Sequence, residues 1–166
     1  MSRIEQNILQ LQGQAETKIV GLQISDHKQQ LATHSIVKFN GPNGSLNQVQ
    51  KAIAKDHSHS IFSGAIDVPQ IAQKTNAAQL SKNLQLSSKA RINTSPQLHI
   101  VADDVQCKHG ATICQLDEEE VFYLQSRGIR YEEANRMLTD GFCKDILNDM
   151  PTEAKRWLHL SEVLNT

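Results

Sequence analysis

The 166-residue sequence predicts a mainly β protein that ends in a small helical tail. Three observations carry this prediction. Short bursts of alternating apolar residues recur from about residue 17 to residue 113, a helical pattern with capping residues begins after Leu116, and the composition changes at the same place. The first part is rich in Gln, Asn, Ser and His and poor in aromatic residues. We therefore expect a β-rich unit at residues 1–116 and a helical unit at residues 117–166.

The expected strands are short and have one buried face. Period-two alternation over four to six residues is typical of such strands. Polar, turn-like stretches such as residues 40–45 separate them, and few intervening segments could form an amphipathic helix. The alternating apolar residues are Val20, Leu22 and Ile24; Val37 and Phe39; Ile66 and Val68; Leu84 and Leu86; and Leu98, Ile100 and Ala102.

Two architectures fit this spacing. One is an antiparallel sandwich or barrel, and the other is a solenoid of stacked short strands. Hairpin motifs are scarce, because only Pro42–Gly44 resembles one. The abundance of Asn, Gln and Ser suits stacked coils, but the repeats are too irregular to define a period. The pattern by itself therefore leaves both architectures open.

The helical tail is predicted from its caps and its apolar face. Asp117 and Glu120 form an Asp-x-x-Glu capping pattern, and Gly128 stands where a left-handed C-terminal cap belongs. A second helix is expected from about Glu132, and a third from Pro151. The second helix would place Ala134, Met137, Leu138, Phe142 and Ile146 on one face, and the third would place Ala154, Trp157 and Leu158 together.

Composition narrows the function classes. The net charge of −1 and the pI near 6.6 give no electrostatic reason to expect nucleic acid or an anionic membrane as a partner. No apolar run approaches the roughly 20 residues that span a bilayer, and the first residues lack the apolar region of a secretory signal. Three cysteines without a Cys-x-x-Cys spacing argue for a reducing compartment. A cytoplasmic protein, or one of the plastid stroma in a plastid-bearing organism, is expected.

The segment Ala-Asp-Asp-Val-Gln-Cys-Lys-His-Gly-Ala-Thr at 102–112 gathers reactive groups. On a strand, Cys107 and His109 would share a face about 7 Å apart along the chain. A structural zinc site needs about four ligands, and no second Cys/His pair has ligand spacing. Asp103 and Asp104 would face opposite sides of a strand, so we expect a turn there and not a joint acid/base pair. An ordinary packing role for Cys107 stays open, and Cys143 is expected in the core.

The segment Gln73–Ile129 resembles the C-terminal half of the SufB/SufD family of iron–sulfur cluster assembly scaffolds. Within the family, residues 102–112 resemble the SufD form, whereas Asp140–Pro151 looks more like the tail of SufB. The matching elements are Gln73-Lys74-Thr75, Asn83-Leu84, Pro96-Gln97-Leu98, Ala102-Asp103-Asp104-Val105, Cys107, His109-Gly110-Ala111-Thr112, Gln115-Leu116-Asp117, Phe122-Tyr123-Leu124 and Ser126-Arg127-Gly128-Ile129.

The resemblance implies a right-handed parallel β-helix followed by a C-terminal helical domain. It also implies a non-enzymatic scaffold subunit of a SufBCD-type complex, which pairs with a SufB-like β-helix subunit, or with itself, and docks a SufC-type ABC ATPase. Cys107 and His109 would then be half of a metal site that a partner chain completes around a transient iron–sulfur cluster; thiolate and imidazole suit iron. No tightly bound cofactor is expected in the chain alone.

Three further expectations follow from the same comparison. The partner-binding residues would be Phe122, Tyr123, Leu124, Arg127 and Ile129. The chain has no Walker motif, so ATP chemistry would belong to the partner. Because the resemblance enters the family's solenoid midway, a fragment or a short copy is expected. The competing hypotheses are a carbohydrate-active β-helix enzyme, which would need convergent carboxylates, and a repeat-type interaction module without metal chemistry.

Overall fold

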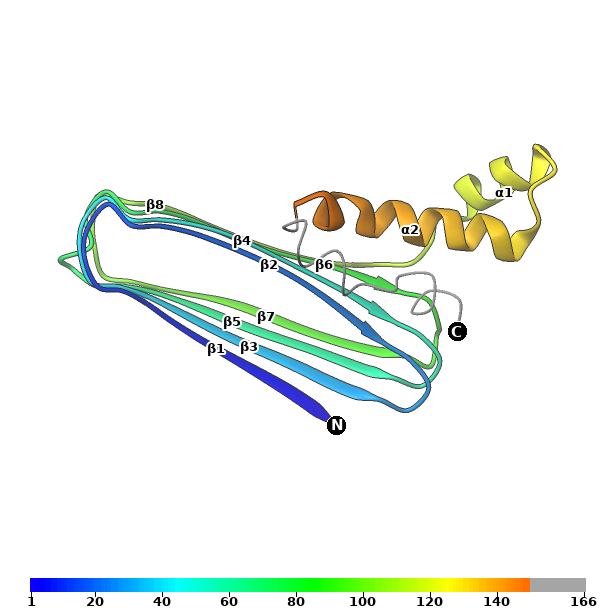
Figure 1. The fold of residues 1–166 in the computed structure, drawn as a ribbon, viewed down its shortest axis with the longest axis horizontal. Coiled ribbons are helices and arrows are strands. Elements are labelled where there is room, and N and C mark those ends of the chain that lie inside the picture. The colour runs from blue at the N-terminus through cyan, green and yellow to red at the C-terminus, as the bar shows by residue number, and fades with distance from the viewer. Residues whose placement is uncertain (150–166) are drawn as a thin grey trace.

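The computed structural model describes residues 1–149, which form two four-stranded parallel sheets followed by two helices (Figure 1). Odd-numbered strands make one sheet and even-numbered strands make the other. The expected third segment from Pro151 lies outside the described residues. The elements are β1 (Ser2–Gln10), β2 (Glu16–Ser25), β3 (Gln30–Phe39), β4 (Ser45–Ala54), β5 (His59–Val68), β6 (Asn76–Gln85), β7 (Arg91–Ile100), β8 (Gln106–Cys114), α1 (Glu118–Ser126) and α2 (Tyr131–Asp149).

The chain is a parallel β-solenoid. Each coil contributes one strand to each sheet, and every strand pairs in parallel with the strand two positions along the chain. Figure 1 shows the two sheets as long layers that face each other and are joined at both ends by stacked turns. Parallel pairing between consecutive coils excludes the hairpin-connected sandwich, and the expected mainly β solenoid with a helical tail is confirmed.

The coils differ in length, which explains why the sequence shows no fixed period. Ser2 pairs with Leu31, so the first coil takes 29 residues, whereas His59 pairs with Arg91, so a later coil takes 32. The strands keep nearly constant length, and the turns absorb the difference. A repeat search by residue number therefore loses its phase from coil to coil.

The interior has an apolar part and a polar part. Val37, Phe39 and Ile66 lie at the centre of the main apolar cluster and are at most 2% exposed. Beside it lie fully buried glutamines, of which Gln48 and Gln79 stack in register on β4 and β6. Strands β1 and β4 have no clear alternation in the sequence. In β4 the reason is that polar side chains occupy part of the interior while helix α2 buries apolar positions of its outer face.

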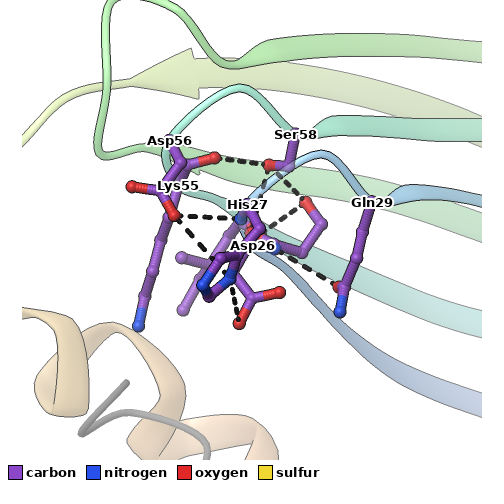
Figure 2. Close-up of polar contacts among 8 residues, drawn as sticks. Asp26, His27, Gln29, Lys55, Asp56 and Ser58 are labelled. Carbon is purple, nitrogen blue, oxygen red and sulfur yellow. Dashed lines mark hydrogen bonds and ion pairs between the residues drawn. The ribbon is translucent and has the colours of Figure 1, made fainter.

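Polar side chains bind together the turns at one end of the solenoid (Figure 2). His27 and Asp56 occupy left-handed backbone positions with φ of 49° and 50°. The backbone N–H of His27 donates to Asp56 Oδ2 at 2.9 Å, and His27 Nδ1 lies 3.4 Å from Asp26 Oδ2. Buried Ser58 donates to the backbone oxygen of Lys55 at 2.7 Å. The contact from His27 to Asp56 crosses from one coil to the next, whereas the other two lie within single turns, so the cluster is part of the turn structure.

Helix α1 begins and ends where its caps predict. The Asp117 side chain accepts from the N–H of Glu119 at 2.8 Å, which satisfies one of the free donors of the first turn. Gly128 adopts φ of +86°, and its N–H donates to the backbone oxygen of Gln125. Val121 is the buried residue of this helix. Neither helix in residues 1–149 is both long and apolar enough for a bilayer crossing.

Helix α2 packs on the outer face of the β2-β4-β6-β8 sheet, as Figure 1 shows. Cys143 is fully buried there with Ile53 and Leu84, as expected for a core cysteine. Lys51 projects from β4 into the same contact and is only 3% exposed. Its Nζ donates to the backbone oxygen of Phe142 and to Asp145 Oδ1. This ion pair fixes the helix to the solenoid.

The buried face of α2 agrees with the predicted one except at one position. Ala134 and Ile146 are buried and Leu138 and Phe142 are partly buried, but Met137 is 46% exposed and Thr139 is buried in its place. Hydropathy ranks Met above Thr and so favours Met137 over Thr139. Thr139 resolves the conflict by donating its hydroxyl to the backbone oxygen of Asn135, so that its polar atom is satisfied inside the helix.

Candidate functional site

Cys107 and His109 both lie on β8, the edge strand of its sheet within residues 1–149. They stand in register with Ala77 and Gln79 of β6, both of which are buried inside the solenoid. Because side chains two apart on a strand share a face, Cys107 and His109 point to the interior side of the last coil. No further coil covers that side within the described chain. The two side chains are therefore at the boundary between interior and solvent.

Cys107 is half-buried against the apolar cluster. Burial raises the pKa of its thiol, and a backbone hydrogen bond from Ala77 partly offsets that rise. Metal binding by this cysteine would therefore release a proton, since the thiolate is the ligand. The structure thus combines features of both readings of Cys107, because the side chain packs as a small hydrophobe while it remains partly accessible.

His109 is exposed, and it follows two glutamines in one interior row. Gln48 on β4 is in register with Gln79 on β6, which is in register with His109 on β8. These three residues also line one groove together with Lys108 and Leu80. Sequence reasoning missed both glutamines. Their separation of one coil could have revealed them, but only once the coil length was known.

The neighbouring carboxylates belong to a turn. Asp103 and Asp104 lie in the bend between β7 and β8, as predicted. Asp103 Oδ2 accepts from Gln70 Nε2 at 3.0 Å, and the N–H of Asp104 donates to Gln73 Oε1 at 2.9 Å. Both residues therefore link this bend to the turn of the preceding coil, Asp103 through its carboxylate and Asp104 through its backbone.

The five expected partner-binding residues separate into exposed and partly buried ones. Phe122 is 72% exposed and Tyr123 is 57% exposed on α1, and Arg127 lies over the Tyr123 ring at 5.3 Å. Leu124 and Ile129 are half-buried. Docking onto the solenoid therefore does not account for the two aromatic side chains, which form an apolar surface open to solvent.

The described residues do not complete a metal site. Among residues 1–149, no three His, Cys, Asp or Glu side chains converge where they could hold a metal ion. Cys107 and His109 supply a soft sulfur and an imidazole nitrogen, both of which suit iron. Any metal bound by this pair would need further ligands from outside the described residues.

The sequence of this chain is similar to a known protein family and to several known proteins. Residues 1–142 match the family described as SUF system FeS cluster assembly, SufBD core domain. The SufBD family protein slr0076 of Synechocystis is 46% identical over 151 residues, which cover 91% of this chain and 33% of that protein. SufD of Escherichia coli is 37% identical over 116 residues, covering 70% of this chain and 27% of SufD. Protein ABCI7 of Arabidopsis, a chloroplastic protein, is 35% identical over 157 residues, covering 94% of this chain and 33% of its length.

The fold and the site define a parallel β-solenoid that carries metal-binding residue types on a terminal strand and a helical tail on one sheet. With the family match over residues 1–142, the chain belongs to the SufB/SufD family. The matched part of the chain covers about a third of the length of slr0076 and of ABCI7. It covers somewhat less of the length of SufD of Escherichia coli.

Proposed function

We propose that this chain acts in iron–sulfur cluster assembly as a non-catalytic scaffold subunit of a SufBCD-type complex. The observation that carries the proposal is the position of Cys107 and His109 on the terminal strand of a SufBD core domain. On an edge that no strand of residues 1–149 covers, these two side chains would supply half of a coordination sphere. A SufB-like subunit that meets this edge would supply the remaining ligands and hold the nascent cluster, the cargo of the complex, between the two chains.

The edge itself has the properties of an interface. Strands β7 and β8 each have one sheet neighbour within residues 1–149, so their outer backbone groups are free to pair. Ile100 is 41% exposed and Ile113 is 48% exposed on these strands. Unpaired strands together with exposed apolar residues favour association with another chain, and a second β-solenoid offers matching strands. A second copy of this chain would offer the same edge.

The decisive experiment replaces His109 in the reconstituted complex. His109→Ala leaves complex assembly intact, because the side chain is exposed, while the yield of cluster on the purified complex falls at least tenfold. His59→Ala is the matched control, since His59 lies on β5 and bonds to Asn93 away from the proposed site. Cluster yield is read from the visible absorption and the iron content. An unchanged yield in an intact His109→Ala complex would falsify the shared-site proposal.

The apolar surface of α1 is the proposed docking surface for a SufC-type ATPase. Phe122 and Tyr123 are the exposed aromatic residues there, and such residues are enriched in interface centres. Removing all residues after Leu116 is a poor test, because it would uncover Lys51, Ile53 and the rest of the sheet face under α2. Point substitutions leave that contact in place.

The ATPase interface is therefore tested by the double substitution Phe122→Ser with Tyr123→Ser. Binding of the purified ATPase weakens by more than tenfold, as measured by calorimetry or analytical ultracentrifugation. Leu9→Ser provides the control, because Leu9 is 53% exposed on β1, far along the chain from α1. Equal affinity of the double variant and the control for the ATPase would move the docking surface elsewhere.

A further inference from the structure

The side-chain oxygen of Gln79 is buried and has no hydrogen-bond partner within residues 1–149. The side chain is 2% exposed, and its Oε1 accepts no hydrogen bond from the described residues. Leaving a buried acceptor unpaired costs about 1–3 kcal/mol, so such an atom calls for an explanation. Four other buried oxygens share this property, but Gln79 alone among them is in register with His109.

The direction of the Gln79 amide follows from its neighbours. Gln79 Nε2 donates to Gln48 Oε1 at 2.8 Å, and Gln48 Nε2 donates to Ser35 Oγ at 3.0 Å. Donation between the two glutamines thus runs from the later coil to the earlier one, and Gln48 then donates across the interior to β3. Because the N–H and C=O bonds of a primary amide point in roughly opposite directions, the Gln79 oxygen faces the next coil, where the next residue in the row is His109.

The facing sheet fixes the amide in this place. A Cβ added to Gly64 on β5 would lie 2.4 Å from Gln79 Nε2 and 2.8 Å from Gln79 Cδ. Glycine at position 64 therefore leaves the space that the amide fills. The amide is held by Gln48 on one side and faces Gly64 on another, so its orientation is restricted.

We propose that Gln79 is a positioning residue for His109: its Oε1 accepts one imidazole N–H and so fixes the tautomer and the orientation of the ring. The other ring nitrogen then carries a lone pair directed away from the solenoid. Histidines that bind metals usually donate their second nitrogen to a carbonyl or carboxylate in this way. This inference rests on the proposed function for its purpose, but the hydrogen bond can be measured without any metal.

The test is ¹⁵N NMR of the histidine side chains in the metal-free chain at pH 8. In the unaltered chain, His109 shows a single tautomer, and its imidazole N–H exchanges with water at least tenfold more slowly than that of exposed His57. Gln79→Met removes the acceptor oxygen and abolishes the protection. Gln50→Met is the matched control, because it removes another buried glutamine, which is in register with Ser81 and not with Gln79.

Two results would overturn the inference. One is an unprotected His109 in the unaltered chain, which needs no variant to fold, and the other is protection that survives in Gln79→Met. The reconstituted complex adds a second measurement, in which Gln79→Met weakens Fe²⁺ binding about tenfold or more. If protection depends on Gln79 but His109→Ala leaves the cluster yield unchanged, the positioning stands and the proposed function fails. If His109→Ala abolishes the cluster yield while the protection of the His109 N–H is the same in Gln79→Met, the proposed function stands and the positioning role of Gln79 fails.

Discussion

The contact between α2 and the solenoid includes the ion pair of Lys51 with Asp145, and the two members of that pair are unequally buried. Lys51 is 3% exposed, whereas the Asp145 side chain is 62% exposed. Lys51 Nζ also donates to the backbone oxygen of Phe142 and lies 4.6 Å from the centre of that ring. Removing Asp145 leaves a buried charge without its counter-ion, whereas removing Lys51 leaves a carboxylate that water can solvate. We therefore expect Asp145→Ala to harm the contact more than Lys51→Met.

The magnitude follows from burial. Breaking a fully buried pair costs about 3–5 kcal/mol, but here one partner is in water and Phe142 still accepts from the lysine, so about 1–3 kcal/mol is expected for Asp145→Ala. Lys51→Met keeps the apolar stem and should cost less than about 1 kcal/mol. Hydrogen exchange of the α2 amides measures this local stability. Asp145→Ala should speed exchange by about tenfold, and Lys51→Met by a few-fold at most.

Acidification provides an independent check of the same contact. Partial burial raises the pKa of Asp145, but the hydrogen bond from Lys51, the backbone N–H of Ile146 and the charge of Lys51 together hold it below its usual range. The stabilisation is therefore complete above the ordinary aspartate value of about 3.9 and disappears as the pH falls through the lower folded value. The difference in exchange between the unaltered chain and Asp145→Ala should vanish there. Equal acceleration by Asp145→Ala and Lys51→Met at neutral pH would refute the reasoning.

Three other predictions concern the thiols, the core and the first helix. Burial raises the pKa of Cys143 to about 11; Lys51 opposes the rise, and Asp140 and Asp145 add to it. Mass spectrometry after brief alkylation at pH 8 should therefore find exposed Cys114 modified and Cys143 intact. Equal labelling of the two cysteines would contradict the burial of Cys143. Phe39→Ala should lower the free energy of unfolding by about 3–5 kcal/mol in denaturant titrations, far more than Ile36→Ala at a 37% exposed position of the same strand. Asp117→Ala should lower the helix content of α1 and cost about 1 kcal/mol, whereas Asp117→Asn should cost little; a similar loss in both would exclude side-chain capping.

The sequence was sufficient to predict that a run of strands precedes a pair of helices. Period-two alternation locates β2, β3, β5, β6 and β7. In β3 and β5 the alternating residues are buried in the solenoid interior, whereas Leu22 and Ile24 of β2 and Leu84 of β6 belong to the cluster under α2. Caps act over a few residues, so Asp117 and Gly128 define α1 by themselves. The pair Cys107 and His109 is also readable, since neighbours two apart on a strand must share a face.

Only the tertiary structure decided which residues of neighbouring coils lie in register. Parallel pairing between coils brings Gln79 beside His109 from 30 positions earlier in the chain, and turns of unequal length hide that register from the sequence. The burial of Lys51 and Thr139 under or within α2 contradicts their hydropathy, because a carboxylate and a backbone oxygen satisfy their polar atoms locally. Alternation and helix capping depend only on residues that are close in the sequence, so both could be predicted. The burial of a polar group depends on its hydrogen-bond partner, which is distant in the sequence or lies within a helix turn. Such burial could therefore only be observed in the structure.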